Sequence, residues 1–259
     1  MISKYWIEAK KVTAIKNGFK VINNLTLKIK SKERVLILGP NGSGKSSIVD
    51  LINRNIYPLE KKNSSFKLFN QKLINIWDLR QKISTVNNDV KYRINPNLLV
   101  INVIISGLYG KFCESKNVNK SDFKLAQELI KKMSISKISH KRFGNLSDGE
   151  KQISLIARAI INNPEILILD EPSINLDLKS KLFLINKLKE LSKCGTNILC
   201  ITHDIEMISN NYSRIILLKD RKIIADGKPD KIMRSKNINK LFDTKIKLLK
   251  HKTNWSISR

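Results

Sequence analysis

The sequence predicts an α/β fold in which parallel strands are joined by crossover helices. One observation is a glycine-rich loop, Gly39 to Ser47, placed between the apolar run Val35 to Leu38 and a helical pattern from Ser46 to Asn53. Another is the regular alternation of helical patterns and apolar strands after Leu146, which is typical of parallel pairing. A chain of 259 residues is also long enough to bury a large core. We therefore expect one domain over residues 1–259.

The first half of the chain yields its elements in order. Strands are expected at Tyr5 to Val12 and Phe19 to Ile29, joined by the turn Lys16-Asn17-Gly18, and a further strand at Glu33 to Leu38 enters the glycine-rich loop. After the helix, the pattern predicts a short strand and turn at Phe66 to Asn70, then a weakly marked region from Ile76 to Gln81 and a polar stretch at Ser84 to Asn97. Two helices are expected next, at Leu98 to Ile105 and at Ser121 to Met133. Ser121 is the expected capping residue of the second.

The second half is more regular. The expected elements are a helix from Leu146-Ser147-Asp148-Gly149-Glu150 to Ile160, a strand at Ile166 to Leu169, a helix at Leu178 to Leu191, a strand at Asn197 to Ile201, and a hairpin of Arg214 to Leu218 with Lys222 to Ala225. The tail from Pro229 to Arg259 is polar and basic, and it predicts one amphipathic helix near Ile238 to Phe242.

Several classes of protein are excluded by composition. No uninterrupted apolar stretch reaches the roughly 18 residues that a membrane helix needs, because Asn102 and Gly107 break the run from Leu98 to Leu108, so the chain is not expected to form a pore. Its start lacks the continuous apolar core of a secretion signal. Three unpatterned cysteines indicate neither a disulfide framework nor a zinc site, which favours a reducing cytoplasm.

The net charge is strongly positive. It amounts to +27, from 49 Lys and Arg against 22 Asp and Glu. A basic surface attracts nucleic acid or anionic membrane, although an AT-rich coding bias toward Lys, Asn and Ile explains the same composition. The lysines are spread along the chain and aromatic residues make up only 6%, so nucleic acid is not the expected partner but stays an open alternative.

The glycine-rich loop matches the pattern G-x-x-x-x-G-K-S of a phosphate-binding loop. Its glycines let successive N–H groups point at phosphate oxygens, and the helix behind it presents a positive end. Lys45 would then reach the outer phosphates, and Ser46 would offer its hydroxyl to Mg²⁺. The candidate nucleotide-binding residues here are Gly39, Pro40, Asn41, Gly42, Ser43, Gly44, Lys45, Ser46 and Ser47.

Two acids follow the apolar strand Ile166 to Leu169. Asp170 and Glu171 stand at the carboxyl end of a strand, where open α/β sheets bind ligands. Asp170 is the candidate Mg²⁺ ligand, and Glu171 is the candidate base that polarises the attacking water. His203 follows another strand and is a second candidate at the γ-phosphate.

Ser147 and Glu150 have the spacing of a helix capping box, and this structural role is sufficient to explain them. A capped helix start that contains Gly149 also leaves N–H groups for a phosphate that comes from elsewhere. The sequence alone leaves both interpretations open.

Taken in order, these segments resemble the nucleotide-binding subunits of the ABC (ATP-binding cassette) ATPases over nearly the whole chain. The matching set is Gly39 to Ser47, Leu146 to Glu150, Ile166 to Glu171, Asn175-Leu176-Asp177, and His203. The resemblance implies a P-loop NTPase of ABC type, with a mixed sheet core, an antiparallel β subdomain, a helical subdomain at roughly residues 84–160 and a basic C-terminal extension at roughly 226–259.

The resemblance also implies how the site works. Ser147 and Gly149 contact the γ-phosphate bound to a second copy, so two chains form a head-to-tail dimer around two ATP molecules with Mg²⁺, and Asp177 lies in the loop that crosses the interface. Glu171 is then the catalytic base and His203 the switch histidine.

Two positions depart from the family pattern. Lys16 stands where an aromatic usually stacks on adenine, and Phe19 or Tyr5 are the substitutes. Asn87 and Asn88 stand where a glutamine usually ligates Mg²⁺, and we assign that role to Asn88. In having asparagine instead of this glutamine, the chain resembles a branch of single-cassette ABC ATPases that are labelled molybdate-type or have no specified cargo.

The implied function is an ATP-hydrolysing subunit on the inner face of the cell membrane that energises separate transmembrane subunits. The alternative is a soluble ABC ATPase in repair, translation or cofactor assembly, but no tandem cassette or long insertion is present. A degenerate regulatory cassette is disfavoured because Lys45, Asp170, Glu171 and His203 are all intact. The transported substrate and the direction of transport are not encoded in these motifs.

Overall fold

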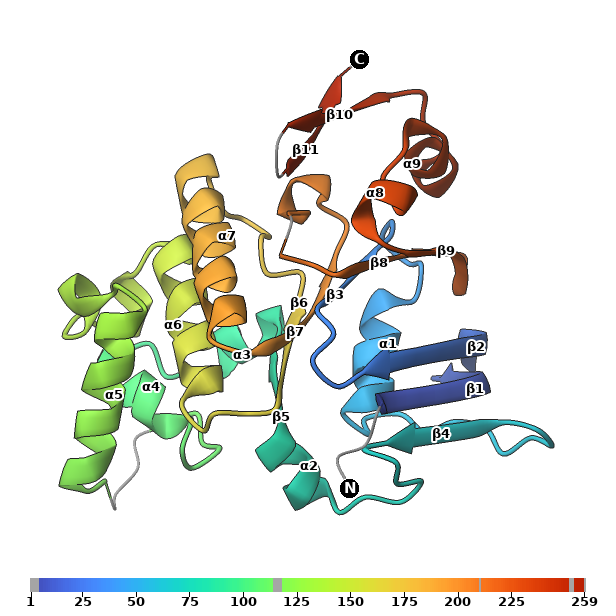
Figure 1. The fold of residues 1–259 in the computed structure, drawn as a ribbon. Helices are drawn as coiled ribbons and strands as arrows, with labels where there is room; N and C mark the ends of the chain where they lie inside the picture. Colours follow the sequence, from blue (N-terminus) through green and yellow to red (C-terminus); the bar gives the residue numbers. More distant parts are fainter. Residues whose placement is uncertain (1–4, 114–117, 210, 252–253, 259) are drawn as a thin grey trace. The chain divides into compact units, whose positions relative to one another are not determined.

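The computed structural model describes residues 5–113, 118–209, 211–251 and 254–258 (Figure 1). The chain divides into two compact units. The first consists of Met1–Arg80 and Asn197–Arg259, and the second of Gln81–Thr196. Each unit has its own strands and helices, and each carries a different group of candidate site residues.

The first unit contains two sheets and a hairpin. Its elements are β1 (Tyr5–Lys16), β2 (Phe19–Lys30), β3 (Val35–Leu38), α1 (Lys45–Ile52), β4 (Ser65–Leu68), β7 (Asn197–Thr202), the 3₁₀ turn η3 (Ile205–Met207), β8 (Arg214–Lys219), β9 (Lys222–Gly227), α8 (Pro229–Ile232), α9 (Ser235–Phe242), β10 (Lys247–His251) and β11 (Asn254–Ser258). Helix α2 (Ile76–Lys82) spans the boundary in sequence between the units. One sheet is antiparallel, in the order β2-β1-β4, and another is mixed, with β3 parallel to both β7 and β8 and with β9 antiparallel to β8.

Strand β3 forms the centre of the mixed sheet. Its four residues, Val35 to Leu38, are completely buried, and Leu36 is paired with Cys200 on one side and Ile215 on the other. A parallel strand covered on both faces is expected to be continuously apolar, which is why this run is easy to recognise in the sequence. Its buried position fixes the point from which the glycine-rich loop leaves the sheet.

Two tight hairpins close in the same way. Asn17 and Gly18 connect β1 to β2 with φ values of 50° and 79°. Asp220 and Arg221 connect β8 to β9 with φ values of 47° and 63°. Two consecutive residues in the left-handed region match the right-handed twist of the flanking strands. Both predicted hairpins are confirmed, although β1 is longer than expected and extends to Lys16.

The C-terminal region contains more structure than the sequence pattern indicated. The predicted amphipathic helix is present as α9, but a short helix, α8, precedes it and an antiparallel hairpin of β10 and β11 follows it. The hairpin was not expected because polar and basic residues interrupt its apolar ones, and an isolated two-stranded hairpin is only marginally stable. Figure 1 shows β10 and β11 beyond α9 at the end of the chain.

The second unit is mostly helical. Its elements are β5 (Ile83–Val86), α3 (Asn88–Arg93), α4 (Val100–Ser106), α5 (Lys120–Lys132), the 3₁₀ turns η1 (Ser136–Ile138) and η2 (Phe143–Asn145), α6 (Asp148–Ile160), β6 (Ile166–Asp170) and α7 (Leu178–Lys193). Strands β5 and β6 are parallel, and α6 contacts both α4 and α7. The stretch predicted as simply polar, residues 84–97, in fact holds most of β5 and all of α3.

The predicted cap of α5 was wrong. The helix begins earlier than expected, and Asn119 is its capping residue, because the Asn119 side chain accepts a hydrogen bond from Asp122 N at 2.9 Å. Asp122 in turn accepts one from Asn119 N at 3.1 Å, which completes a capping box. Ser121 lies inside the helix and donates from Oγ to Asn119 Oδ1 at 2.6 Å. Asn is as good a cap as Ser, so the residue types alone did not distinguish them.

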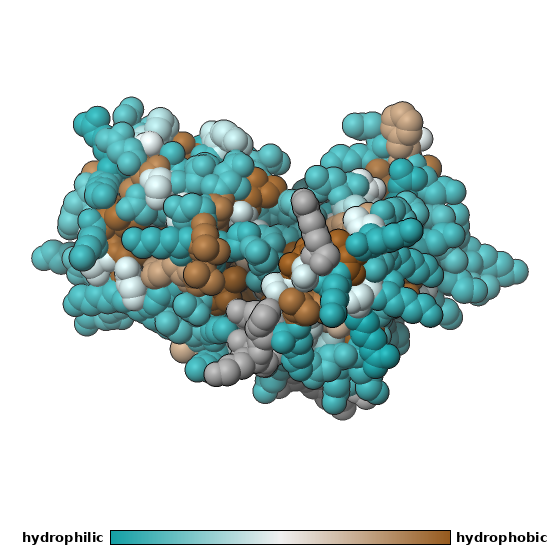
Figure 2. Space-filling view, turned by 90° about the horizontal axis from the view of Figure 1, so that it is seen from above, coloured by the Kyte–Doolittle hydropathy of each residue, from teal (hydrophilic) through white to brown (hydrophobic). Residues whose placement is uncertain are grey.

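Among the described residues, no helix is long and apolar enough to cross a membrane. Figure 2 shows one face of the molecule, on which hydrophilic residues cover most of the surface and hydrophobic residues occupy smaller areas.

Candidate functional site

The glycine-rich loop leaves β3 under tight steric constraint. Gly39 N donates a hydrogen bond to Thr202 O on β7 at 3.2 Å, and a Cβ on Gly39 would lie 2.2 Å from Leu218 O on β8. Such a short distance to a backbone oxygen leaves no space for any side chain at this position. Glycine is therefore required at Gly39 because the loop passes between the ends of two neighbouring strands.

Lys45 is folded back onto the loop that precedes it. Its side chain is buried, with 5% relative exposure, and Nζ donates to Gly39 O at 2.8 Å and to Pro40 O at 3.0 Å. Burying an ammonium group is unfavourable unless it is well hydrogen-bonded, so the loop holds this charge in a defined place. The ammonium group lies inside the curve of the loop, where a phosphate oxygen would meet it.

The loop also presents unused hydrogen-bonding capacity. Ser43 is 3% exposed, and its Oγ has no hydrogen-bond partner among the described residues. Helix α1 starts after Gly44, which has φ 99° and provides no side-chain cap, and no acid lies in its first turn. A helix start without these groups presents the positive end of its dipole to an anion. These features fit a bound phosphate chain.

His203 belongs to the same unit as the loop. It is exposed and directly follows Thr202, the residue whose carbonyl accepts the hydrogen bond from Gly39 N. The next residue, Asp204, donates from N to Thr202 Oγ1 at 3.0 Å and caps η3. His203 therefore directly follows the residue that is hydrogen-bonded to the start of the glycine-rich loop.

The second unit carries the candidate base Glu171 and two of the three candidate metal ligands, Asp170 and Asn88. Val86 on β5 is paired with Leu169 on β6, so the residues that follow both strands emerge at the same edge. These residues are Asn87 and Asn88 after β5, and Asp170 and Glu171 at the end of β6. Asn87 uses its side-chain oxygen to accept from Val90 N at 3.2 Å and so caps α3.

Glu171 has an unusual backbone conformation. Its φ is 53°, in the left-handed region that side chains other than glycine seldom adopt. A residue in this conformation costs about 1–3 kcal/mol, and such residues cluster at functional sites. No feature of the sequence predicted this conformation.

The segment Leu146 to Glu150 and the loop that contains Asp177 lie close together in the second unit. Ser147 and Glu150 form the predicted capping box of α6, with Glu150 N donating to Ser147 Oγ at 3.2 Å and Ser147 N donating to Glu150 Oε2 at 2.9 Å. A Cβ on Gly149 would lie 2.3 Å from Ser180 Oγ in the first turn of α7. The starts of α6 and α7 are therefore packed directly against each other.

Asp177 caps α7 by accepting from Ser180 N at 2.7 Å. The pKa of the Asp177 carboxyl is lowered below its usual value, mainly by the hydrogen bond from the Ser180 backbone and to a smaller extent by one from the Ser180 side chain. Asp177 is exposed, so it combines a local capping role with an accessible position.

The position expected to hold an adenine-stacking aromatic is occupied by an ion pair. Lys16 Nζ lies 2.7 Å from Asp50 Oδ2 on α1. Phe19 is paired with Lys16 across the hairpin and is 74% exposed, whereas Tyr5 is at the opposite end of β1, where it pairs with Lys30. Of the two predicted substitutes, Phe19 is therefore at the appropriate end of the strand.

Two contacts near the candidate residues were missed by the sequence analysis. Arg221 N donates to Ser43 O at 3.0 Å, and the Arg221 side chain packs beside Gly44, so the β8-β9 turn supports the glycine-rich loop. Lys91 on α3 forms an ion pair with Asp148 at the start of α6. Neither contact carries a local signal, because the residues of each pair are far apart in the sequence.

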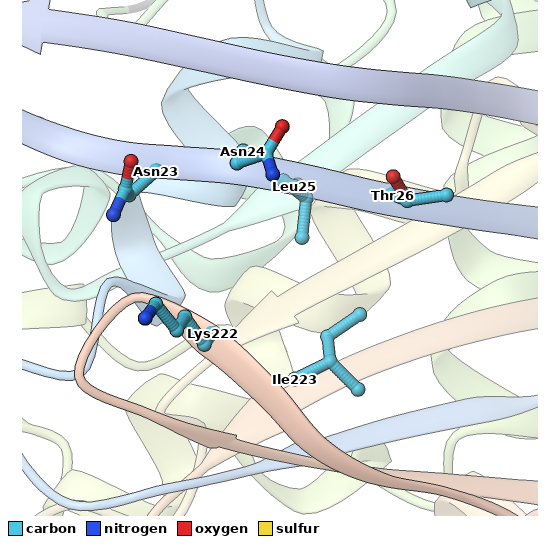
Figure 3. A pocket seen from close by; sticks show the side chains of 6 residues that line it. All are labelled: Asn23, Asn24, Leu25, Thr26, Lys222 and Ile223. Atoms are coloured by element: carbon cyan, nitrogen blue, oxygen red, sulfur yellow. The ribbon is translucent and has the colours of Figure 1, made fainter.

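A cavity of about 280 Å³ lies between β2 and β9 in the first unit, and none of the candidate site residues lines it. It is lined by Asn23, Asn24, Leu25, Thr26, Lys222 and Ile223 (Figure 3). In Figure 3, Leu25 and Ile223 point into the space between the two strands. The lining contains no carboxylate, histidine or cysteine, so it offers no acid–base pair for catalysis.

Comparisons with known proteins agree on one family. The family model described as ABC transporter matches residues 22–174. An uncharacterized ABC transporter ATP-binding protein of Lactococcus lactis, YmeB, is 29% identical over 93% of this chain and 94% of its own length. A putative ABC transporter ATP-binding protein of Caldanaerobacter subterraneus is 31% identical over 83% of this chain and 88% of its own.

Solved structures give the same result. An ATP-binding cassette solved as a dimer bound to ADP and Pi is 29% identical, covers 86% of this chain and 98% of its own, and has a TM-score of 0.71. CbiO1 of Clostridium perfringens, part of the cbiONQ transporter complex, has a TM-score of 0.78 at 23% identity over 92% of this chain and 94% of its own, which supports the fold. The predicted α/β cassette fold is thereby confirmed.

Proposed function

The chain belongs to the ABC transporter family of ATP-binding subunits, and from that premise we propose that one group of its candidate residues binds ATP and the other hydrolyses it. As a member of this family it binds and hydrolyses ATP and energises a transporter. The soluble non-transport alternative is not favoured, since the relatives are named as transporter subunits. The observation that carries the proposal is the buried Lys45, held inside the loop by Gly39 and Pro40.

Each residue of the first group has a separate task. Lys45 binds the β- and γ-phosphates as a point charge, and the loop N–H groups with the Ser43 hydroxyl hold their oxygens. His203 hydrogen-bonds the γ-phosphate from the end of β7. The support for these roles is the enclosed Lys45, the unpartnered Ser43 Oγ and the position of His203 after Thr202.

The second group carries out the chemistry. Glu171 accepts a proton from the water that attacks the γ-phosphorus, the bond to the bridging oxygen of ADP breaks, and inorganic phosphate is released. Asn88 and Asp170 stand at the same edge of β5 and β6 as Glu171.

The residues also fit Mg²⁺. The donors are the Ser46 hydroxyl, the Asp170 carboxylate and the Asn88 amide oxygen, all of which are hard oxygen ligands. Within the described residues, no group of three or more His, Cys, Asp or Glu side chains is arranged so that it could hold a metal ion. A magnesium ion bound by one carboxylate together with substrate phosphates requires no such cluster. When bound, the ion neutralises charge that develops on the phosphate oxygens.

We propose that a second copy completes the site. Ser147 and Gly149 at the start of α6 would bind the γ-phosphate held by the partner chain, and Asp177 would lie in the loop that crosses the interface. The close packing of Gly149 against Ser180 supports this, because it places the two segments side by side. A dimer bound to ADP and Pi is known for a cassette 29% identical to this chain.

The remaining proposals concern the adenine ring of ATP and the membrane partner. Phe19 is proposed to stack on adenine, because it is exposed at the same end of the hairpin as Lys16, which occupies the position of the usual aromatic residue. A separate transmembrane subunit is proposed as the partner, with this chain bound at the cytoplasmic face of the membrane. Nucleic acid is not proposed as a partner, and the molybdate-type branch stays a prediction.

One pair of variants tests the site. Glu171→Gln is expected to give an ATP-bound dimer that elutes early in size-exclusion chromatography and has almost no turnover. Lys45→Ala is expected to weaken ATP binding itself, measured by equilibrium titration, and to give no dimer. Normal hydrolysis by Glu171→Gln would show that the base is another residue. Recovery of an integral membrane protein with the tagged chain from solubilised membranes tests the partner, and recovery of only soluble partners would contradict it.

A further inference from the structure

The C-terminal hairpin has one deeply buried side chain. Trp255 on β11 is 3% exposed, whereas Ile257 on the same strand is 51% exposed. Of the β11 side chains that the structure describes, Trp255 alone is buried. A buried tryptophan contributes a large apolar area, so it fixes the position of the strand that carries it.

Strand β11 contacts η3, the 3₁₀ turn that follows the candidate switch histidine. The turn is apolar on its inner side, where Ile205 and Met207 are 6% and 1% exposed. Only Asp204 separates His203 from η3, and its side chain accepts from Glu206 N at 3.0 Å to cap the turn. A displacement of η3 is therefore transmitted to His203 through one residue, Asp204.

The hairpin is itself attached to the sheet that carries the glycine-rich loop. Leu248 N donates to Ser235 Oγ at 2.9 Å, and Ile246 N donates to Asn239 Oδ1 at 2.9 Å, so the start of the hairpin is bound to α9. Helix α9 contacts β8. Lys219 at the end of β8 donates from Nζ to Lys240 O at 2.8 Å. Figure 1 shows the hairpin lying beside α9.

We propose that Trp255 is a positioning residue for His203, and that the hairpin of β10 and β11 holds η3 so that the histidine stays in register with the glycine-rich loop. The inference rests on the proposed role of His203 at the γ-phosphate. His203 is held on one side by β7, through Thr202, and on the other side by η3. Loss of the buried Trp255 side chain loosens β11 against η3 and so weakens only the second support; ATP binding at the loop is retained while hydrolysis becomes slower.

The test is a double-mutant cycle on the full chain, with kcat and KM for ATP as readouts. Trp255→Ala is expected to lower kcat about tenfold, since displacements of about 1 Å from a productive geometry reduce rates by up to 10²-fold. KM for ATP should stay within about twofold of the wild-type value. Trp255→Phe should restore most of kcat because it keeps an aromatic ring at the position. Ile257→Ala is the matched control on the same strand and should leave kcat unchanged.

The double variant separates this inference from the proposed function. If Trp255 acts through His203, then His203→Ala with Trp255→Ala should be no slower than His203→Ala alone. Multiplicative losses in the double variant, or an unchanged kcat in a folded Trp255→Ala, would overturn the inference. An unchanged kcat in His203→Ala alone would instead reject the proposed role of His203. If Trp255→Ala fails to fold, the same cycle is measured with Trp255→Leu, which keeps an apolar side chain.

Discussion

Replacing Gly42 by alanine tests whether the backbone conformation of the glycine-rich loop, rather than its side chains, is required for nucleotide binding. Gly42 has φ 78°, and a Cβ built on it meets no atom within 4 Å. A steric clash with the rest of the protein therefore contributes nothing to the effect. Within the protein, the cost of Gly42→Ala is that of holding an alanine in the left-handed region, which is about 1–2 kcal/mol.

This cost can appear in either of two measurements. If the loop keeps its conformation, the free energy of unfolding falls by the full amount, and each kcal/mol lowers Tm by about 2–4 °C for a chain of this size. If the exposed loop relaxes in the free protein, the strain has to be restored on binding. Full transfer of the cost to binding weakens ATP affinity by a factor of roughly 5–30. The two losses should add up to about 1–2 kcal/mol.

Gly195→Ala is the matched control. Gly195 has φ 90°, is exposed, and also meets nothing within 4 Å, but it lies just after α7 and outside both groups of site residues. It should lose a similar amount of stability and keep its affinity for ATP. Urea denaturation without nucleotide gives the stability, and equilibrium titration gives the affinity. Two results would contradict the reasoning: wild-type stability together with wild-type affinity in Gly42→Ala, or equal affinity losses in the two variants.

Three further predictions follow from local geometry. Gly149→Ala should lower the free energy of unfolding by about 1–3 kcal/mol, because its Cβ would clash with the Ser180 side chain. Adding Ser180→Gly should recover part of this loss in denaturant melts, and no recovery would contradict the packing. Asn119→Ala should cost about 1 kcal/mol and Ser121→Ala less than about 0.5 kcal/mol, and the reverse order would restore Ser121 as the cap. Arg221→Gly should raise the free energy of unfolding by about 1 kcal/mol because φ 63° suits glycine, and a loss of stability would count against the left-handed turn.

The elements that could be predicted are those whose signal is local. The apolar run Val35 to Leu38 followed by a glycine-rich loop is sufficient to identify a buried parallel strand. Ser147 and Glu150 form the predicted capping box because both partners of each hydrogen bond lie within four residues. The cap of α5 was assigned wrongly for the same reason, because two good capping residues stand two positions apart and the sequence does not indicate which one ends the extended segment.

The features that could not be predicted depend on distant parts of the chain. Hairpin β10-β11 is polar apart from a few residues, and it is held by α9 and η3 rather than by its own pattern. The contact of Arg221 with Ser43 joins residues that only the mixed sheet brings together. Composition and periodicity contain no information on such pairs, because they are set by tertiary packing.

The conformation of Glu171 shows why the choice of substitution at the candidate base matters. At φ 53° glutamine carries about the same backbone cost as glutamate, so Glu171→Gln removes the negative charge and leaves the turn after β6 unchanged. A loss of turnover in this variant therefore reports on the carboxylate. Glu171→Gly would remove the charge and also relieve the strain, which frees the backbone next to Asp170. Any change in its activity would then combine two causes, so the glutamine variant is the one that isolates proton acceptance from the geometry of the metal ligand.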